Sequence, residues 1–296
     1  MSDIPKHIGR YSVETLIGEG GMAKVYLGHA HSASGFSRPV ALKVLQPHLR
    51  GDARFERMLI GEATWGGKLY HDGLVPTYEL GLHEGSYFVC MEYVPGFTLA
   101  ELASKITIPQ SMAQFIIAKI ALALHYVHTY ANDEGTGLGL VHRDITPSNV
   151  IVSQAGHVKL VDFGIAKATS QSSETQGNLL KGTYAYMSPE QIDGDTLTAQ
   201  SDIFSLGTLF YELLTASRAF DGESVHETMR RVRECEWGWP NTTLDAACVA
   251  IVEQCLQRDC RQRFASAREV YEAFLPLQHP FNVWQIADIW PNSTCS

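Results

Sequence analysis

A glycine-rich segment near the start of the chain contains residue types that can bind phosphate. It runs from Gly18 to Val25 with the sequence GEGGMAKV. Glycines let backbone N–H groups approach phosphate oxygens closely. A glycine-rich turn between two strands is also common as a plain hairpin. The last small residue of the segment is Ala23 rather than glycine, which gives up some conformational freedom. The segment alone therefore leaves both interpretations open.

A lysine in an apolar segment is the next candidate. Lys43 ends the run VALK at 40–43, and Glu62 follows within a segment that we expect to be helical. A buried lysine needs a carboxylate partner. A pair between Lys43 and Glu62 would orient the ammonium group toward phosphates. A lone lysine in a strand is more often a surface charge, so this pairing needs support from the rest of the chain.

Four further motifs follow in order and supply that support. They are HRDITPSN at 142–149, DFG at 162–164, GT at 182–183 and SPE at 188–190. The first matches the pattern H-R-D-x-x-x-x-N, and the last is a variant of A-P-E. With these motifs the chain resembles the protein kinase family over roughly residues 10–275. The segments GGMAKVY and GTYAYMSPEQ are most similar to the corresponding segments of the bacterial kinases of eukaryotic type.

The resemblance implies a set of residues that bind ATP. They are Gly18, Gly20, Gly21, Val25, Ala41, Lys43, Met91, Glu92, Val94, Ile151 and Asp162. The glycines cover the phosphates, and the valine, alanine and isoleucine at 25, 41 and 151 enclose the adenine. Lys43 holds the α- and β-phosphates and pairs with Glu62. Met91 guards the back of the pocket, and the backbone of Glu92 and Val94 bonds the adenine edge.

The resemblance also implies which residues do chemistry. The expected catalytic set is Asp144, Lys43, Glu62, Asn149 and Thr183. Asp144 would accept the proton of the substrate hydroxyl. Asn149 and Asp162 would coordinate Mg²⁺, a hard cation that suits carboxylate and amide oxygens. Phosphoryl transfer needs in-line positioning and cations against phosphate oxygens, and these residues would supply most of that.

Structural and regulatory roles complete the residues carried over from the family. Glu190 would pair with Arg263 as a structural bridge, and Asp202, expected to open its helix, would brace the catalytic loop. The regulatory residues would be Arg143, Lys167 and Thr175. A phosphate on the loop at 169–175, placed there by a second copy in a transient homodimer, would form charge-assisted bonds to these cations and order the loop.

Two kinds of element must position these residues. Residues 11–45 predict three strands, 52–70 a helix and 77–94 two more strands around a His-Glu-Gly turn. Apolar residues at helical spacing follow at 110–131, two short strands flank the turn near 155, and helices are expected at 202–215, 223–234, 245–257 and 266–277.

This order of elements agrees with the fold that the resemblance implies. It is the α+β, two-lobe protein-kinase fold, with a small β-rich N-lobe carrying one main helix and a larger, mostly helical C-lobe. We expect the kinase domain at 10–275, with the N-lobe at about 10–93, the hinge at about 92–97 and the C-lobe at about 98–275. Residues 276–296 form a C-terminal tail that either docks on the helical lobe or begins a linker.

Composition narrows the classes of partner. The 296 residues carry a net charge of −9, which argues against a nucleic-acid binder. The six cysteines form no CxxC pair and no disulfide framework. The N-terminus lacks the basic start and following apolar run that are typical of a signal peptide. The longest apolar stretch, 115–127, is too short to span a bilayer. We expect a cytoplasmic enzyme that acts on protein substrates.

The catalytic loop departs from the family at one position. Serine/threonine kinases usually carry a lysine two residues after the catalytic aspartate, and tyrosine kinases an arginine there or two residues later. The chain has Thr146 and Ser148. Pro147, Thr183 and the SPE motif still favour serine and threonine as acceptors. The main alternative is a pseudokinase that acts as a scaffold, and a third is a small-molecule phosphotransferase of related fold.

Overall fold

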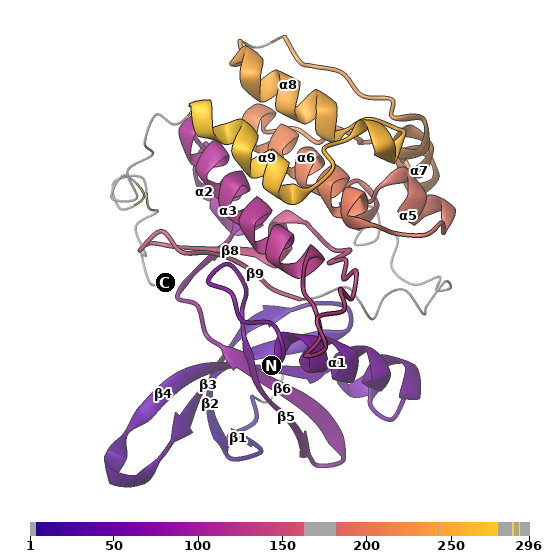
Figure 1. Cartoon of the computed structure of the whole chain (residues 1–296). Coiled ribbons are helices and arrows are strands. Elements are labelled where there is room, and N and C mark those ends of the chain that lie inside the picture. Colours follow the sequence, from indigo (N-terminus) through magenta and orange to yellow (C-terminus); the bar gives the residue numbers. More distant parts are fainter. Residues whose placement is uncertain (1–3, 163–181, 242, 278–285, 287–289, 291–296) are drawn as a thin grey trace. The chain divides into compact units, whose positions relative to one another are not determined.

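The structure is a computed structural model that describes residues 4–162, 182–241, 243–277, 286 and 290. The chain divides into two compact units. Described residues up to Pro95 belong to the first unit, and those from Gly96 onward belong to the second. Figure 1 shows a sheet with one long helix in the first unit and a bundle of helices with a small sheet in the second.

The first unit is built on a six-stranded antiparallel sheet with the order β1-β2-β3-β4-β6-β5. The strands are β1 (His7–Ile8), β2 (Tyr11–Glu19), β3 (Ala23–His31), β4 (Ser37–Leu45), β5 (Thr77–His83) and β6 (Ser86–Glu92). One part of its core contains buried residues from four of these strands, among them Tyr11, Leu42 and Phe88. Short 3₁₀ turns lie at Ala33–Gly35 and Pro47–Leu49.

Helix α1 (Ala53–Gly66) packs against β4, β5 and β6. Its first turn is capped by Asp52, whose carboxylate accepts a hydrogen bond from the Arg54 N–H. The helix ends at Gly66, earlier than the expected residue 70. A Cβ at Gly66 would lie 2.4 Å from the Thr77 hydroxyl, so only glycine allows this close contact with β5.

The small sheet of the second unit has the order β7-β8-β9, with strands β7 (Gly96–Thr98), β8 (Val150–Ser153) and β9 (Val158–Leu160). A Cβ at Gly96 would lie 2.3 Å from the Val152 carbonyl oxygen, so β7 approaches β8 closely only because residue 96 is glycine. The 3₁₀ turn at Pro147–Asn149 leads directly into β8. This sheet therefore anchors the end of the segment that carries Asn149.

The described part of the chain has eight labelled helices. Helix α1 belongs to the first unit, and the rest belong to the second. Those of the second unit are α2 (Leu99–Lys105), α3 (Gln110–His128), α5 (Pro189–Asp193), α6 (Ala199–Thr215), α7 (Val225–Glu234), α8 (Ala246–Cys255) and α9 (Ala267–Phe274). Short 3₁₀ turns also lie at Cys260–Gln262 and Leu275–Leu277. Helices α3 and α6 are buried over most of their length and pack against each other, and α9 packs on both.

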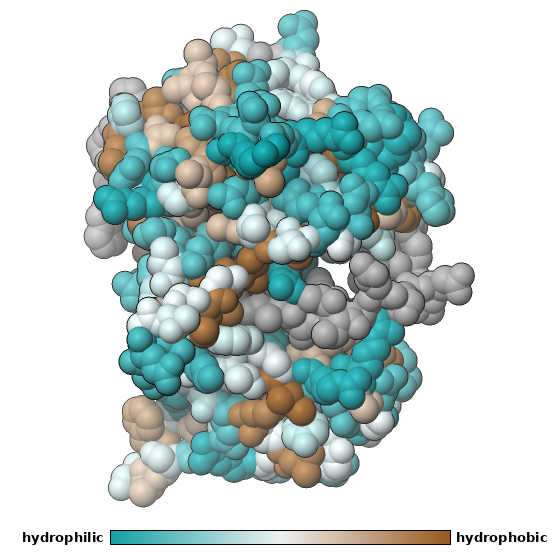
Figure 2. Space-filling model, turned by 45° about the vertical axis from the view of Figure 1, so that its right-hand side comes forward, coloured by the Kyte–Doolittle hydropathy of each residue, from teal (hydrophilic) through white to brown (hydrophobic). Residues whose placement is uncertain are grey.

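The expected fold class is confirmed, with differences in detail. The predicted strands and long helices are present, and α6 begins at Ala199 rather than at Asp202. Helices α2 and α5 were not anticipated. Figure 2 shows hydrophilic atoms over most of the drawn face of the helical unit and smaller hydrophobic groups on the unit that holds the large sheet. No helix among the described residues combines the length and apolar character that crossing a bilayer requires.

Two described residues of the C-terminal segment contact the second unit or lie inside it. Ile286 is fully buried, and the Trp290 ring lies 5.2 Å from the Phe97 ring, centroid to centroid. The sequence left open whether 276–296 docks on the helical lobe or begins a linker. These two positions favour docking.

Candidate active site

The glycine-rich turn joins β2 to β3. None of Gly18, Gly20 and Gly21 has a left-handed φ. A Cβ at Gly18 or Gly20 would make only ordinary contacts, at 3.7 Å from its nearest neighbour. The local fold therefore does not itself require glycine at these two positions. Because glycine has no side chain, it leaves space in which a ligand can approach the backbone closely.

The predicted pair of Lys43 and Glu62 is present. Lys43 lies on β4 and is 5% exposed, and its Nζ is 2.7 Å from Glu62 Oε1 on α1. Lys43 is paired with Val25 of β3. Val25 lies five residues after Gly20, the second glycine of the segment. The register of β3 and β4 thus fixes the position of this ammonium group relative to the glycine-rich turn.

The residues expected around adenine in the first unit lie on β3, β4 and β6 and just after β6. Ala41 stands opposite Met91, and both side chains are buried. The Glu92 N–H donates to the Pro76 carbonyl at 3.1 Å, so this N–H is already engaged within the unit. Val94 is also buried.

Asp144 and Asn149 lie in direct contact in the second unit. The Asn149 side-chain amide donates to Asp144 Oδ2 at 2.7 Å and to the Asp144 carbonyl at 3.0 Å. Both amide hydrogens are therefore directed at Asp144, and the amide oxygen is directed elsewhere. The Val161 N–H donates to the Asn149 carbonyl at 3.0 Å, so the residue before Asp162 is tied to Asn149. Ile151 lies on β8, opposite Thr98.

Asp202 braces the catalytic loop from within the helical unit. Its carboxylate accepts hydrogen bonds from the His142 and Arg143 backbone N–H groups, each at 2.7 Å. His128 Nε2 lies 2.8 Å from the same carboxylate. Burial by itself raises the pKa of Asp202, but the hydrogen bond and charge of His128 outweigh it and leave the pKa below its ordinary value. Asp202 therefore stays ionised while fully buried.

Arg143, next to Asp144, has a strained backbone that is held on both sides. Its φ is 70°, in the left-handed region that non-glycine residues rarely adopt. Its N–H is bound by Asp202, and its carbonyl accepts from Gln191 Nε2 at 2.9 Å. Asp162 has a φ of 59°. Such strain persists only where the surroundings fix it, and it gathers at functional sites.

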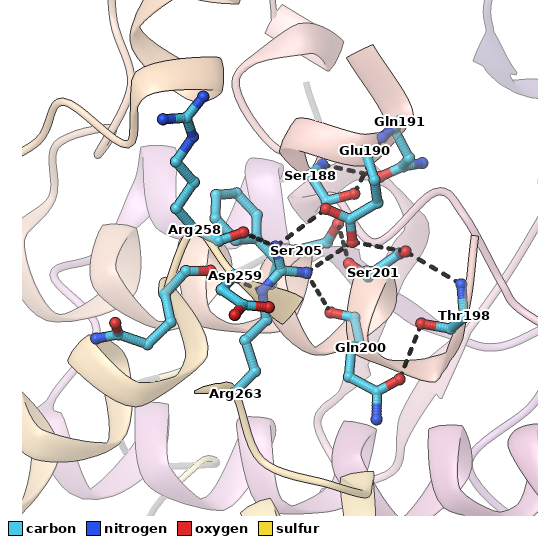
Figure 3. Close-up of polar contacts among 12 residues, drawn as sticks. Ser188, Glu190, Gln191, Thr198, Gln200, Ser201, Ser205, Arg258, Asp259 and Arg263 are labelled. Atoms are coloured by element: carbon cyan, nitrogen blue, oxygen red, sulfur yellow. Dashed lines mark hydrogen bonds and ion pairs between the residues drawn. The ribbon is translucent and has the colours of Figure 1, made fainter. Parts of the chain in front are cut away.

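The expected bridge between Glu190 and Arg263 is present and highly connected (Figure 3). The guanidinium donates to both Glu190 oxygens, at 2.6 and 3.0 Å. It also donates to the carbonyls of Gln257, Gln200 and Arg258. Burial acts to raise the pKa of Glu190, but the bond to Arg263 and its charge prevail and lower it. The bridge fixes α5, and with it the segment 182–188, against the helical unit.

The segment 182–188 is tied to α6 through Tyr186, whose hydroxyl donates to Glu212. Burial, together with the Glu212 charge, raises the pKa of Tyr186. The Tyr186 N–H donates to the Thr183 carbonyl at 3.2 Å. Thr183 is thus held in an ordered turn, partly exposed, between the glycine at 182 and a buried tyrosine.

The position that departs from the family is buried. Thr146 is 8% exposed and precedes the 3₁₀ turn, while Ser148 is exposed. Lys24, on the strand that follows the glycine-rich turn, is a cation that could in principle replace the missing lysine. Its Nζ lies 3.2 Å from Glu19 Oε1 on the neighbouring strand. Lys24 is therefore already engaged within its own unit, which argues against that substitute.

Several predicted residues lie outside the described residues. They are Phe163, Gly164, Lys167 and Thr175.

Other residues that hold the site in place were not predicted, although the sequence carried a signal for some of them. Gln191 is the fourth residue of an S-x-x-Q capping box that begins at Ser188. Ser201, which donates to Glu190 at 2.8 Å, stands in a second such box. His128 carried no local signal, because its partner is distant in the sequence.

Each unit, taken by itself, carries groups that fit one part of a nucleotide with a hard divalent cation. A buried ammonium group paired with a carboxylate suits phosphate oxygens. The Asn149 amide oxygen and the Asp162 carboxylate are ligand types that Mg²⁺ accepts, with the remaining positions left to phosphate and water. Across the described ranges, no group of three or more His, Cys, Asp or Glu side chains is placed to hold a metal ion.

Comparison with known proteins shows one matching family. The protein kinase domain family matches residues 11–281. A tyrosine-protein kinase, MasK of Myxococcus xanthus, is 40% identical over 221 residues, covering 73% of the chain and 34% of that protein.

Serine/threonine-protein kinases are similar to the same region. PrkC of Bacillus subtilis is 38% identical over 218 residues, covering 73% of the chain and 32% of PrkC. PknB of Mycobacterium tuberculosis is 34% identical over 277 residues, covering 90% of the chain and 42% of PknB. The chain thus spans about a third to two-fifths of the length of these relatives.

Proposed function

Because the chain belongs to the protein kinase family, we propose that it transfers the γ-phosphate of ATP to serine or threonine hydroxyls of proteins. The observation that carries this proposal is the pair of Asp144 and Asn149, held in place through the bonds of Asp202 to the backbone beside them. A pseudokinase scaffold would have no use for such a constrained carboxylate. Localisation in the cytoplasm and protein substrates belong to the same proposal.

The chemistry assigns one task to each group. Lys43, oriented by Glu62, binds the α- and β-phosphates. Asp144 accepts the hydroxyl proton while the acceptor oxygen forms a bond to the γ-phosphorus. The bond from that phosphorus to the bridging oxygen breaks, and ADP leaves with the electron pair. Mg²⁺, held by Asn149 and Asp162, would neutralise phosphate charge when bound. Asn149 also orients the Asp144 carboxylate through the bond between their side chains.

The test is transfer of labelled phosphate from ATP to a general protein substrate and to the chain itself. Wild type should transfer, and Asp144→Asn should lose nearly all transfer while it keeps nucleotide binding. A matched control is Asp245→Asn, at an exposed helix cap far in sequence from the motifs. Transfer by Asp144→Asn at the wild-type rate would reject the assignment of the base. Absence of transfer by folded wild type would favour the pseudokinase alternative.

Tyrosine is the second candidate acceptor, and one comparison favours it. MasK carries the name of a tyrosine-protein kinase, and neither Thr146 nor Ser148 supplies the cation that separates the two kinase classes. Analysis of the phosphorylated amino acids in the products decides between them. The proposal predicts phosphoserine and phosphothreonine. Phosphotyrosine as the main product would overturn the assignment of acceptor.

Activation by phosphorylation of the segment 169–175 is a further part of the proposal, with Thr175 as the preferred site. Support comes from Arg143, whose Nε is buried and has no hydrogen-bond partner in the part of the chain that the structure describes. A phosphate is a partner of the right chemistry. Lys167 would join it.

Mass spectrometry after incubation with ATP and Mg²⁺ should find phosphate within 169–175. The rate per molecule should rise with protein concentration if a transient homodimer carries out the reaction. A fully active preparation without phosphate in that segment would refute this mode of activation.

A further inference from the structure

Gln46 is a buried polar residue that no motif includes. It directly follows β4, three residues after Lys43, and is 9% exposed. Its backbone N–H donates to the Met22 carbonyl at 2.9 Å. Its side-chain amide donates to the Gly20 carbonyl and to Glu19 Oε1, both at 3.1 Å. Gln46 thus binds three residues of the glycine-rich segment: Glu19, Gly20 and Met22.

Glu19 strengthens the attachment of Gln46 to the glycine-rich turn. Its carboxylate is bound by both the Gln46 amide and the Lys24 ammonium group. The hydrogen bond from Gln46, and then the contact with Lys24, lower the pKa of Glu19. The carboxylate therefore remains ionised and its charge is matched by groups of its own unit. An ionised acceptor also forms a stronger hydrogen bond than a neutral one does.

The bonds to Gln46 set the direction of one peptide group in the turn. In a trans peptide the carbonyl and the following N–H point in opposite directions. The Gly20 carbonyl points at the Gln46 amide, so the Gly21 N–H points away from it. Gly20 itself donates to the Ala23 carbonyl at 2.9 Å, which closes the turn. Gly21 is an exposed residue, so an anion can reach this part of the turn.

We propose that Gln46 is a positioning residue for the triphosphate of ATP, which fixes the glycine-rich turn in register with Lys43 and aims the Gly21 N–H at a phosphate oxygen. This inference rests on the proposed use of ATP. Gln46 and Lys43 belong to one continuous piece of backbone, so the two phosphate-binding elements are set by the same strand. Gln46 acts through the turn and does not itself touch the nucleotide.

The test compares two ligands on the full chain. Gln46→Leu keeps the approximate size of the side chain and removes the amide. Its Kd for ATP with Mg²⁺, measured by calorimetry, should rise about 3- to 10-fold, the loss expected for one or two hydrogen bonds. Its Kd for adenosine, which has no phosphates, should stay unchanged. Gln257→Leu, at an exposed helix-end glutamine, is the matched control and should change neither value.

An equal rise for both ligands, or no rise for ATP, would overturn the inference. A second readout needs no nucleotide. Hydrogen exchange of the backbone amides at 20–23 should be faster in Gln46→Leu than in wild type and in Gln257→Leu, and unchanged exchange would reject the role of Gln46.

Glu19→Gln, at an exposed position, keeps the bond to Gly20 and should give a smaller rise in the same direction. A wild-type chain that binds ATP but transfers no phosphate would reject the proposed function and leave this test intact.

Discussion

Two buried ion pairs, one in each unit, have the same charges and different surroundings. The guanidinium of Arg263 has five N–H groups, and the structure places all five in hydrogen bonds within the second unit. Its side chain is 0% exposed. The face of Phe204 lies 4.8 Å from it. Lys43 instead presents a compact ammonium group to Glu62 of α1 from β4, an interior strand of the large sheet.

The difference separates a pair that maintains the fold from one that is suited to a ligand. A saturated, planar guanidinium has no donor left for another molecule. An ammonium group is a point charge with three rotatable donors, which can be shared between a carboxylate and phosphate oxygens. Sequence motifs predict both pairs with equal ease. The saturated donors of Arg263 show that this pair serves the architecture, and the chemistry of an ammonium group suits the other pair to a ligand.

The largest effect on stability should follow loss of Arg263. Arg263→Ala leaves Glu190 as a buried carboxylate without its cation, and three carbonyls lose a donor. We expect a loss of about 3–5 kcal/mol in the free energy of unfolding, measured by denaturant titration. Arg268→Ala, which breaks an exposed i,i+4 pair with Glu272, is the matched control and should cost at most about 0.5 kcal/mol. Equal losses in the two variants would remove the distinction between the pairs.

A smaller loss is expected from Asp202→Asn. An amide has one acceptor oxygen, so its NH₂ group must face a backbone N–H of either His142 or Arg143. We expect a cost of about 1.5–3 kcal/mol in stability and a lower kcat, because Arg143 loses part of its restraint. Asp245→Asn, at an exposed cap where asparagine serves as well, should change neither quantity. Wild-type kcat in a stable Asp202→Asn protein would contradict the bracing role.

Substitution of Thr146 tests whether the catalytic loop lacks a cation that phosphate transfer needs. Loss of an electrostatic contact to the transferred group typically costs about 2–4 kcal/mol in the barrier. We expect partial compensation in the wild type, so Thr146→Lys should raise kcat by roughly tenfold at saturating ATP. Thr146→Met, long but uncharged, controls for size at this buried position. An unchanged or lower kcat in folded Thr146→Lys would show that the missing cation is dispensable.

Acid should remove the stability that the buried carboxylates of the second unit provide. Both Glu190 and Asp202 have a pKa lowered by folding, so their contribution is present above the unfolded pKa near 4 and is lost as pH falls through the folded values. Unfolding free energy should therefore decrease steadily below about pH 4. The decrease should be shallower in Asp202→Asn. Equal slopes in the two proteins would contradict the assigned ionisation.

Sequence patterns predict the residues whose signal is local. Strands β2 to β6 follow from β-rich segments between turns, and the two ion pairs follow from motifs at fixed positions. Helices α2 and α5 escaped prediction because they have only 7 and 5 residues, although each begins with a capping box. Gln46 and His128 could not be identified at all. Their partners lie 26 and 74 residues away, so their roles exist only once the sheet and the helices have formed.

The most direct test of the account is Lys43→Met, assayed for transfer of labelled phosphate and for thermal unfolding in the same preparation. Methionine keeps most of the apolar stem that packs in the sheet and removes the ammonium group. The account predicts loss of nearly all transfer in a protein that still folds, with a smaller drop in stability than in Arg263→Ala. Lys43→Met leaves Glu62 without its cation, whereas Arg263→Ala also leaves three carbonyls without a donor. Near-normal transfer by Lys43→Met would contradict the role of Lys43 in phosphate binding and, with it, the proposed function.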